Sequence, residues 1–346
     1  MKPFDYIRPE RLGQALSEGA KPGSAYLAGG TNLLDLMKTG AARPERLVDI
    51  TRLPGLDRWE WGKDGGLRIG AMVRNSDAAH DPDIAAAFPA MAEALLSGAS
   101  GQLRNAATMG GNVMQQTRCH FFADPFSPCN RRAPGAGCAA QGGERRGFAV
   151  LGGSDACIAT HPSDLCVALA ALDAVVEIAG PEGLRETPLT DFHLLPGTGP
   201  EGHTRLAPGE LIIALRLPAA AAGFRHHARY LKLRDRTSFA FALVSAAALL
   251  RIEDGVIAEA RLALGGVAPK PWRATAAEAL LQGARPDADS FARAAEAALQ
   301  GAAGHDAKIT LAKRLAARAL IQAARGTPAR VPALPGSVHS GETAHV

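Results

Sequence analysis

Aromatic residues are scarce in this chain of 346 residues: phenylalanine, tryptophan and tyrosine together make up only 5% of it. Proteins that bind nucleic acids commonly stack bases on aromatic rings beside a strongly basic surface. Here the net charge is only +4, and basic runs such as Arg145–Arg146 are short and contain no aromatic residue. The composition therefore argues against a nucleic-acid-binding protein.

Long hydrophobic runs are also missing. The longest, from Phe239 to Leu250, contains Ser245 and is shorter than the roughly 20 residues that a membrane-spanning helix needs. The segment Met1–Pro9 has no apolar core and contains Asp5, so it does not resemble a secretory signal. We expect no membrane span and synthesis in the cytoplasm. Residence in the periplasm would then require export together with a partner that carries a signal.

Cysteine is rare as well, but it is concentrated in one segment. Four of the five cysteines lie in a stretch rich in glycine, proline and arginine, where few apolar residues are present: Cys119, Cys129, Cys138 and Cys157. Disulfide frameworks are typical of much smaller secreted domains. Four thiolates in irregular backbone can instead hold a metal ion or an iron–sulfur cluster. Their intervals match neither ferredoxin spacing nor the paired C-x2-C motifs of common zinc sites.

Arginine is enriched around these cysteines. The basic residues outnumber the acidic ones: Arg118, Arg131, Arg132, Arg145 and Arg146 against Asp124, Glu144 and Asp155. Cations would help to hold an anionic cluster, although a solvated surface or a partner interface would have the same composition. The fifth cysteine, Cys166, lies among apolar residues of a predicted helix, and we expect it to fill the core. For the nearby His161 we expect a structural or capping role.

The predicted elements divide the chain into three folded parts and a tail. Residues 1–53 read as an α/β unit. Residues 54–222 read as a larger α+β region that contains the irregular cysteine segment at about 114–160. Residues 223–326 combine strands with amphipathic helices. Residues 327–346 are rich in proline and polar residues and are predicted to form a loose tail.

Helical spacing of apolar residues is clearest in four stretches. The alanine-rich residues 83–96 are predicted to be helical, and so are segments near 275–282, 288–300 and 309–324. Tyr26–Ala28 is predicted to be a short strand.

Three glycine-containing turns are candidate ligand sites. They lie within Leu27–Leu34, Arg104–Asn112 and Leu151–Asp155. The first turn joins a predicted strand to a predicted helix, and its missing side chains would let a pyrophosphate approach the backbone. It is not a G-x-G-x-x-G motif, so a Rossmann dinucleotide site is not predicted. Each turn alone could be ordinary, but three together favour one extended ligand with phosphate and sugar groups.

The order of five motifs resembles a known family. The motifs are L-A-G-G-T-N-L, R-N-x-x-T-x-G-G-N, P-S-D-L, Y-L-K-L-R and G-G-V-A-P-K-P. This order is similar to that of the FAD-binding subunits of the molybdenum hydroxylase family, over residues 1–325. The resemblance implies an α+β protein. Its parts would be a vanillyl-alcohol-oxidase-type FAD domain of two α/β subdomains and a C-terminal α+β domain of the carbon monoxide dehydrogenase flavoprotein type.

The resemblance also implies which residues contact FAD. The first loop would hold the pyrophosphate, and the implied contacts are Leu27, Ala28, Gly29, Gly30, Thr31, Asn32, Leu33, Leu34, Thr108, Gly111, Asn112, Asp164 and Lys232. Asp164 would accept hydrogen bonds from cofactor hydroxyls, or it could cap a helix. Lys232 would stabilise negative charge on the reduced flavin, or it could be a solvated strand lysine.

The cysteine segment departs from the commoner family pattern, in which the second glycine loop runs almost directly into P-S-D-L. It closely resembles an insertion in the flavin subunits of bacterial periplasmic aldehyde oxidoreductases, which holds a [4Fe–4S] cluster. The implied ligands are Cys119, Cys129, Cys138 and Cys157. The flavin subunit of 4-hydroxybenzoyl-CoA reductase has an analogous insertion with different spacing.

Together these resemblances imply an electron-transfer subunit of a molybdenum-dependent aldehyde oxidoreductase that binds FAD and a [4Fe–4S] cluster. Its partners in a heterotrimer would be a large molybdopterin subunit and a small [2Fe–2S] subunit, and its electrons would pass to an external acceptor. Two alternatives stay open. One is the flavin subunit of a 4-hydroxybenzoyl-CoA reductase-like enzyme, and the other is a non-catalytic scaffold in which the thiolates hold zinc.

Overall fold

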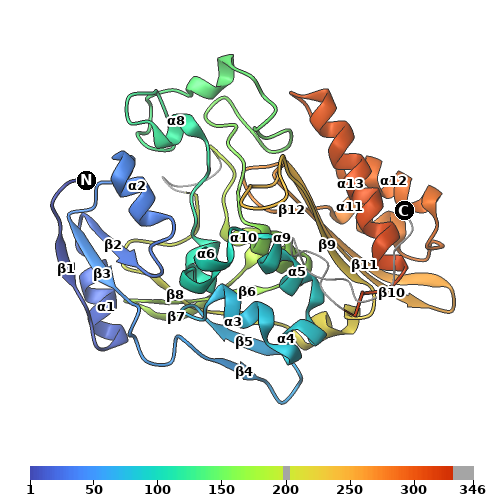
Figure 1. The fold of residues 1–346 in the computed structure, drawn as a ribbon, viewed down its shortest axis with the longest axis horizontal. Helices are drawn as coiled ribbons and strands as arrows, with labels where there is room; N and C mark the ends of the chain where they lie inside the picture. The colour runs from blue at the N-terminus through green and yellow to red at the C-terminus, as the bar shows by residue number, and fades with distance from the viewer. Residues whose placement is uncertain (198–202, 330–346) are drawn as a thin grey trace.

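The computed structural model describes residues 1–197 and 203–329. Three β-sheets follow one another along the chain, and the cysteine segment lies at the top of Figure 1, between the first and third sheets. Most of the predicted tail, residues 330–346, lies outside the described residues. The domain boundaries given above stay a prediction.

The first sheet is parallel, with its three strands in the order β1-β3-β2. Its elements are β1 (Asp5–Ile7), α1 (Leu12–Gly19), β2 (Ser24–Leu27), α2 (Leu33–Thr39) and β3 (Arg46–Asp49). Strand β2 begins earlier than the predicted strand and ends at Leu27, because the chain turns from Ala28 into Gly29 and Gly30. The first glycine loop therefore projects from the end of a strand that is held in a sheet.

The second sheet is antiparallel, with five strands in the order β4-β5-β8-β6-β7. The strands are β4 (Trp59–Trp61), β5 (Leu67–Gly70), β6 (Val175–Gly180), β7 (Gly183–Pro188) and β8 (Leu211–Leu217). Its helices are α3 (Asn75–His80), α4 (Pro82–Ala87), α5 (Pro89–Ser97), α6 (Gly101–Ala106), α7 (Met109–Val113), α9 (Asp164–Ala171), α10 (Leu189–Phe192) and the 3-10 helix η2 (Ala219–Phe224). One apolar core joins this sheet to α5 and α9.

The alanine-rich stretch 83–96 forms two helices, α4 and α5, and not one. The break lies at Phe88, whose φ of −130° and ψ of 60° are not helical. Pro89 follows directly, and a proline disfavours the helical conformation of the residue before it. Pro89 then occupies the first position of α5, where its missing N–H costs no hydrogen bond.

The third sheet is antiparallel, in the order β12-β11-β10-β9, and Figure 1 shows three helices along one of its faces. Its elements are β9 (Ala228–Leu233), β10 (Val244–Glu253), β11 (Val256–Gly265), β12 (Trp272–Arg273), α11 (Thr275–Leu281), α12 (Ala288–Ala298) and α13 (Asp306–Ala324). Helix α13 begins before the predicted residue 309, because His305 Nδ1 accepts a hydrogen bond from Lys308 N–H (3.1 Å) and caps it.

Strand β10 contains the second part of the longest apolar run of the sequence, residues 244–250. Ala246, Ala248 and Leu250 pack in the core with the three C-terminal helices. Ala247 and Leu249 point to the opposite face, where they join the core of the second sheet. A strand covered on both faces is apolar throughout. In the described part of the chain, no helix has the length and hydropathy of a membrane span.

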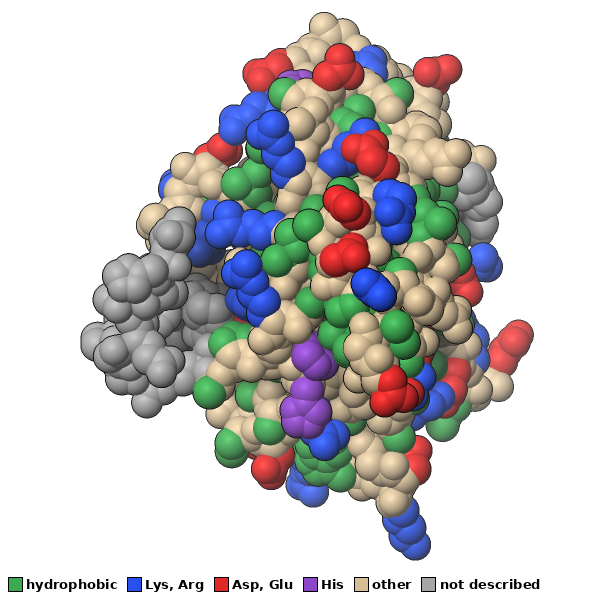
Figure 2. Space-filling view, turned by 90° about the vertical axis from the view of Figure 1, so that its right-hand side faces the viewer, with side chains coloured by type: hydrophobic (Ala, Val, Ile, Leu, Met, Phe, Trp, Pro, Cys, Tyr) green, Lys and Arg blue, Asp and Glu red, His purple; other side chains and the backbone are tan. Residues whose placement is uncertain are grey.

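The cysteine segment is mostly irregular. Its only described helices are α8 (His120–Ala123) and the 3-10 turn η1 (Ala139–Gly142). Lys308 of α13 is buried and donates a hydrogen bond to the backbone oxygen of Phe148 (2.7 Å), which fastens the end of this segment to the C-terminal part. On the face drawn in Figure 2, basic and acidic side chains intermingle.

A buried ion pair connects helix α5 to strand β9, and its loss should destabilise the fold. Glu93 accepts hydrogen bonds from Arg229 Nε (3.0 Å) and from the backbone N–H of Tyr230 (2.5 Å). Arg229→Leu would leave the Glu93 carboxylate buried without a counter-charge, so the free energy of unfolding should fall by about 3–5 kcal/mol. Denaturant unfolding measures this change.

The exposed pair of Lys2 and Glu45 provides the control, because 51% and 68% of the two side chains are accessible. Lys2→Met should change the free energy of unfolding by less than about 1 kcal/mol. Equal changes in the free energy of unfolding would show that the buried pair stabilises the fold no more than the exposed pair does.

Candidate functional site

A cavity of about 960 Å³ is lined by residues from all three parts of the chain. Cavities that hold cofactors and other small molecules commonly have volumes of about 300–1,000 Å³. Six of the predicted cofactor contacts line it: Thr31, Asn32, Gly111, Asn112, Asp164 and Lys232. The other seven belong to the same two glycine loops: Leu27, Ala28, Gly29, Gly30, Leu33, Leu34 and Thr108.

The two glycine loops pack directly against each other. A Cβ atom at Gly29 would lie 2.0 Å from the backbone oxygen of Ala106, at the end of α6. Gly30 has a φ of 72°, which favours glycine. In the second loop the Thr108 hydroxyl accepts a hydrogen bond from Gly111 N–H (3.2 Å). The small residues are therefore needed for the loops to meet, in addition to any role in binding a ligand.

Two asparagines at the cavity have their oxygen atoms occupied by protein donors. Asn32 Oδ1 accepts a hydrogen bond from Gln116 N–H (2.8 Å), and Asn32 Nδ2 is buried without a partner. Asn112 Oδ1 accepts from Ser163 Oγ (2.7 Å) and from Gln115 Nε2 (2.6 Å). The amide N–H groups are left to donate to a ligand. This donor set fits an acceptor-rich group such as the diphosphate of FAD.

Asp164 and Lys232 form a buried ion pair at the cavity. Asp164 Oδ2 lies 2.7 Å from Lys232 Nζ, and the two side chains are 8% and 3% exposed. Asp164 Oδ1 accepts a hydrogen bond from the Tyr230 hydroxyl (2.5 Å). Burial raises the pKa of Tyr230 well above its usual value, and the Asp164 charge adds to this shift. Lys232 is thus not a solvated strand lysine.

Ser163, and not Asp164, caps helix α9. Its hydroxyl accepts a hydrogen bond from Cys166 N–H (3.1 Å). Asp164 is the first residue of the helix, and its carboxylate is left to interact with Lys232 and Tyr230. The alternative that Asp164 serves only as a cap is therefore wrong.

The four clustered cysteines surround a second, small cavity. Cys129 and Cys138 are paired by an isolated antiparallel bridge. Among the described residues, no three of these sulfur atoms lie within 4.8 Å of one another. Four thiolates on one zinc ion, each at about 2.3 Å, would be about 3.8 Å apart. The four cysteines thus converge on one small cavity.

A buried arginine accompanies these thiols. Arg131 lines the small cavity, and its Nε atom is buried without a partner. Burial lowers the pKa of its guanidinium, and the nearby Cys157, Cys129 and Cys119 oppose this shift. Burial also raises the pKa of the Cys119 and Cys157 thiols. An anionic group held by thiolates would supply the counter-charge that this arginine lacks, so the residues fit a four-thiolate iron–sulfur cluster.

The two cavities share one wall. Thr117, Cys119 and Phe121 line both the large cavity and the small one. Cys119 therefore lies between the residues predicted to bind FAD and the other three cysteines.

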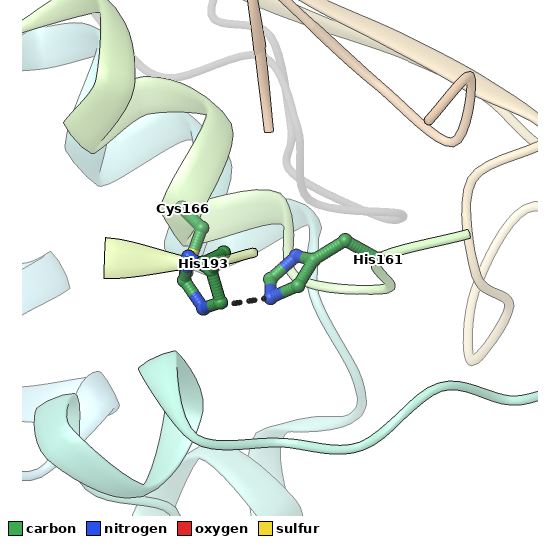
Figure 3. Close-up of side chains that lie close together, drawn as sticks. All are labelled: His161, Cys166 and His193. Atoms are coloured by element: carbon green, nitrogen blue, oxygen red, sulfur yellow. Dashed lines mark hydrogen bonds between the residues drawn. The ribbon is translucent and has the colours of Figure 1, made fainter. Parts of the chain in front are cut away.

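Sequence reasoning missed a buried histidine pair beside the large cavity. His161, Cys166 and His193 lie together in Figure 3, and their ligand atoms are all within 4.8 Å of one another. Burial lowers the pKa of His161 well below its usual value, lowers that of His193 to about 4 and raises that of Cys166 to about 12. Cys166 belongs to the main core, as expected. No motif surrounds His193, so nothing in the sequence indicated this contact.

Comparison with known families decides the broader identity. Residues 2–220 match the FAD binding domain in molybdopterin dehydrogenase, and residues 229–323 match the CO dehydrogenase flavoprotein C-terminal domain. The chain belongs to the FAD-binding subunits of the molybdenum hydroxylase family. It is thus part of an oxidoreductase, and FAD is the cofactor of its N-terminal domain.

Individual relatives agree with this assignment. The aldehyde oxidoreductase FAD-binding subunit PaoB of Escherichia coli K12 is 50% identical over 326 residues, which cover 93% of this chain and 99% of PaoB. The carbon monoxide dehydrogenase medium chain of Hydrogenophaga pseudoflava is 30% identical over 299 residues, which cover 86% of each chain.

Solved structures confirm the predicted α+β fold class. A chain of carbon monoxide dehydrogenase from Hydrogenophaga pseudoflava superposes with a TM-score of 0.74 and 28% identity, over 94% of this chain and 99% of that one. A chain of quinoline 2-oxidoreductase from Pseudomonas putida 86 gives a TM-score of 0.72 and 27% identity, over the same shares of the two chains.

The close contact at Gly29 gives a test of the flavin cavity. In Gly29→Ala, the new methyl group would collide with the backbone oxygen of Ala106 and force the two loops apart. We expect the purified variant to carry less than about a tenth of the wild-type FAD, because separated loops cannot both contact the cofactor. Flavin released by denaturation, measured per folded chain, gives the value.

Gly13→Ala is the matched control. A Cβ atom at Gly13, in helix α1, meets no atom within 4 Å, so this variant should keep the full FAD content. If Gly29→Ala also kept its FAD, the first loop would not form part of the flavin site.

Proposed function

We propose that this chain is the FAD- and [4Fe–4S]-binding electron-transfer subunit of a molybdenum-dependent aldehyde oxidoreductase. Two findings support the aldehyde reaction: the 50% identity to an aldehyde oxidoreductase FAD-binding subunit over nearly the whole chain, and the cysteine insertion. The large cavity, which lies beside that insertion, is where the predicted FAD contacts come together.

The observation that carries the proposal is the wall shared by the two cavities. Cys119 lines the large cavity and is also one of the four convergent cysteines. A cluster held by these thiolates would be the immediate neighbour of the flavin site, and redox centres must be close together to exchange electrons.

In the large cavity, the chain would hold FAD by the donors already described. The amide groups of Asn32 and Asn112 would donate to acceptor oxygens of FAD, and the two glycine loops would present their backbones to its diphosphate. Bound FAD supplies the chemistry, since it accepts and releases electrons singly or in pairs. Lys232 would offset negative charge that develops on the reduced cofactor, and Asp164 keeps this lysine in place (2.7 Å).

In the small cavity, the thiolates of Cys119, Cys129, Cys138 and Cys157 would be the ligands. A [4Fe–4S] cluster supplies one-electron chemistry. Arg131 would lie beside its anionic sulfurs as a buried cation. The intervals between the four cysteines differ from the paired C-x2-C motifs of common zinc sites, which favours a cluster over a single zinc ion.

Other redox centres of the enzyme would lie on other chains. The sequence has five cysteines, of which four are assigned here, so it cannot also supply the thiolates of a [2Fe–2S] centre. We therefore assign the molybdopterin site to a large partner subunit and the [2Fe–2S] centres to a small one, in a heterotrimer. The chain would pass their electrons to an external acceptor. It would reach the periplasm by export with a signal-bearing partner.

The absorption spectrum of the anaerobically purified protein tests both cofactors at once. We expect structured flavin bands on a broad brown absorption, with four iron and four labile sulfide per FAD. A yellow protein that contains zinc and no iron would leave the flavin assignment intact and overturn the cluster assignment. A colourless protein would overturn both.

Cys129→Ser should remove the cluster and leave the flavin site folded. Cys129 is the most buried of the four candidate ligands, and a serine oxygen is a poor ligand for iron. Iron and sulfide should fall below about a tenth of the wild-type content, since a cluster held by four thiolates tolerates few losses. Elemental analysis and the loss of brown absorption measure this outcome.

Cys166→Ala is the matched control, because Cys166 is also buried but lies in the core of α9. It should retain the full iron content. Retention of four iron atoms by Cys129→Ser, or their loss from Cys166→Ala, would refute the proposed ligand set.

A further inference from the structure

His193 lies at the end of the short helix α10 and is buried, with 4% of its surface exposed. It does not line the large cavity, whereas His161 does. Its Nε2 atom faces two groups from different segments. One is the backbone oxygen of Val113 (3.0 Å), at the end of the second glycine loop, and the other is His161 Nε2 (3.1 Å). Figure 3 shows the two rings meeting through these nitrogens.

His161 continues the connection into the cavity wall. Its Nδ1 atom lies 3.4 Å from the backbone nitrogen of Ser163, two residues along the chain. The Ser163 hydroxyl donates to Asn112 Oδ1 (2.7 Å), and Asn112 is the direct neighbour of Val113. The contacts thus form a closed circuit of His193, Val113, Asn112, Ser163 and His161. Three of its members, Asn112, Ser163 and His161, line the cavity.

The same contacts argue against a metal ion at these histidines, although Cys166 is near enough to serve as a third ligand. His193 Nε2 faces both a carbonyl oxygen and His161 Nε2, so neither Nε2 atom is free for a metal ion. The other nitrogen of His193, Nδ1, is buried without a partner. Burial keeps both imidazoles neutral, with one N–H each. His193 can therefore share its Nε2 hydrogen between Val113 O and His161 Nε2 when His161 carries its own hydrogen on Nδ1.

We infer that His193 is a positioning residue for the flavin site. It fixes the position of the second glycine loop relative to the P-S-D-L loop. The Asn112 amide and the Asp164 carboxylate therefore face the cavity together. The inference rests on the proposed binding of FAD in this cavity. It concerns a residue that does not touch the cofactor and that no family motif contains.

The first test compares His193→Leu with His227→Leu in the purified protein. His227 is a useful control because its Nδ1 atom also contacts a backbone oxygen (Ala323, 3.0 Å), but far along the chain in the C-terminal part. Loss of one or two hydrogen bonds should weaken FAD binding about tenfold in His193→Leu. His227→Leu should keep the wild-type dissociation constant, even if its melting temperature falls. Flavin fluorescence on dilution gives the dissociation constant, and thermal unfolding of the FAD-free protein gives the stability.

A second comparison does not depend on a leucine being tolerated in the core. In His193→Gln, the side-chain N–H can reach the position of Nε2 and donate to Val113 O, whereas the shorter side chain of His193→Asn cannot. His193→Gln should therefore bind FAD about tenfold more tightly than His193→Asn. Both variants introduce a neutral amide, so a merely structural role would affect them alike.

Equal FAD affinities of His193→Gln and His193→Asn would overturn the inference, and so would an unchanged affinity in His193→Leu. These results differ from a failure of the proposed function, in which the wild-type protein would contain no FAD. If the wild-type protein holds FAD and Gly29→Ala loses it, the cavity is established and only the role of His193 is in question.

Discussion

The wall between the two cavities is the constraint on which this structure depends. Thr117, Cys119 and Phe121 contact the large cavity and the small one, so the two sites are direct neighbours. The insertion does not interrupt the flavin domain, because it leaves after the second glycine loop and returns before P-S-D-L. It adds a side to a cavity whose remaining walls come from the glycine loops, helices α5 and α9 and strand β9. The flavin domain therefore accommodates the cysteine segment without a new fold.

Charge at this wall is balanced by buried pairs. Lys232 faces Asp164, and Tyr230 donates to the same carboxylate. Arg131 lines the cysteine cavity, and its Nε atom is buried without a partner. Buried charges of this kind are costly when unpaired. The flavin side is thus balanced within the protein, whereas on the cysteine side Arg131 Nε is left without a partner.

Patterns of neighbouring residues predicted many of the helices, strands and turns. Where these predictions were wrong or ambiguous, there is a physical cause. The glycine turns, the strand that enters the first turn and the C-terminal helices follow from backbone conformation and apolar periodicity. The stretch 83–96 was misread as one helix because periodicity does not register the restriction that Pro89 places on Phe88. Asp164 was ambiguous between a cap and a ligand-facing carboxylate, and only the hydrogen bond from Cys166 N–H to Ser163 resolved it.

The sequence by itself determined the kind of chemistry, because glycine and cysteine have properties that few other residues can supply. Gly29 admits a backbone where no side chain fits, and Cys129 offers a thiolate, wherever the chain places them. Tertiary structure alone decided that Cys119 lies at the wall of the flavin cavity and that His193 meets Val113 and His161. These contacts join segments far apart along the chain, and their distances depend on how the sheets and helices pack together.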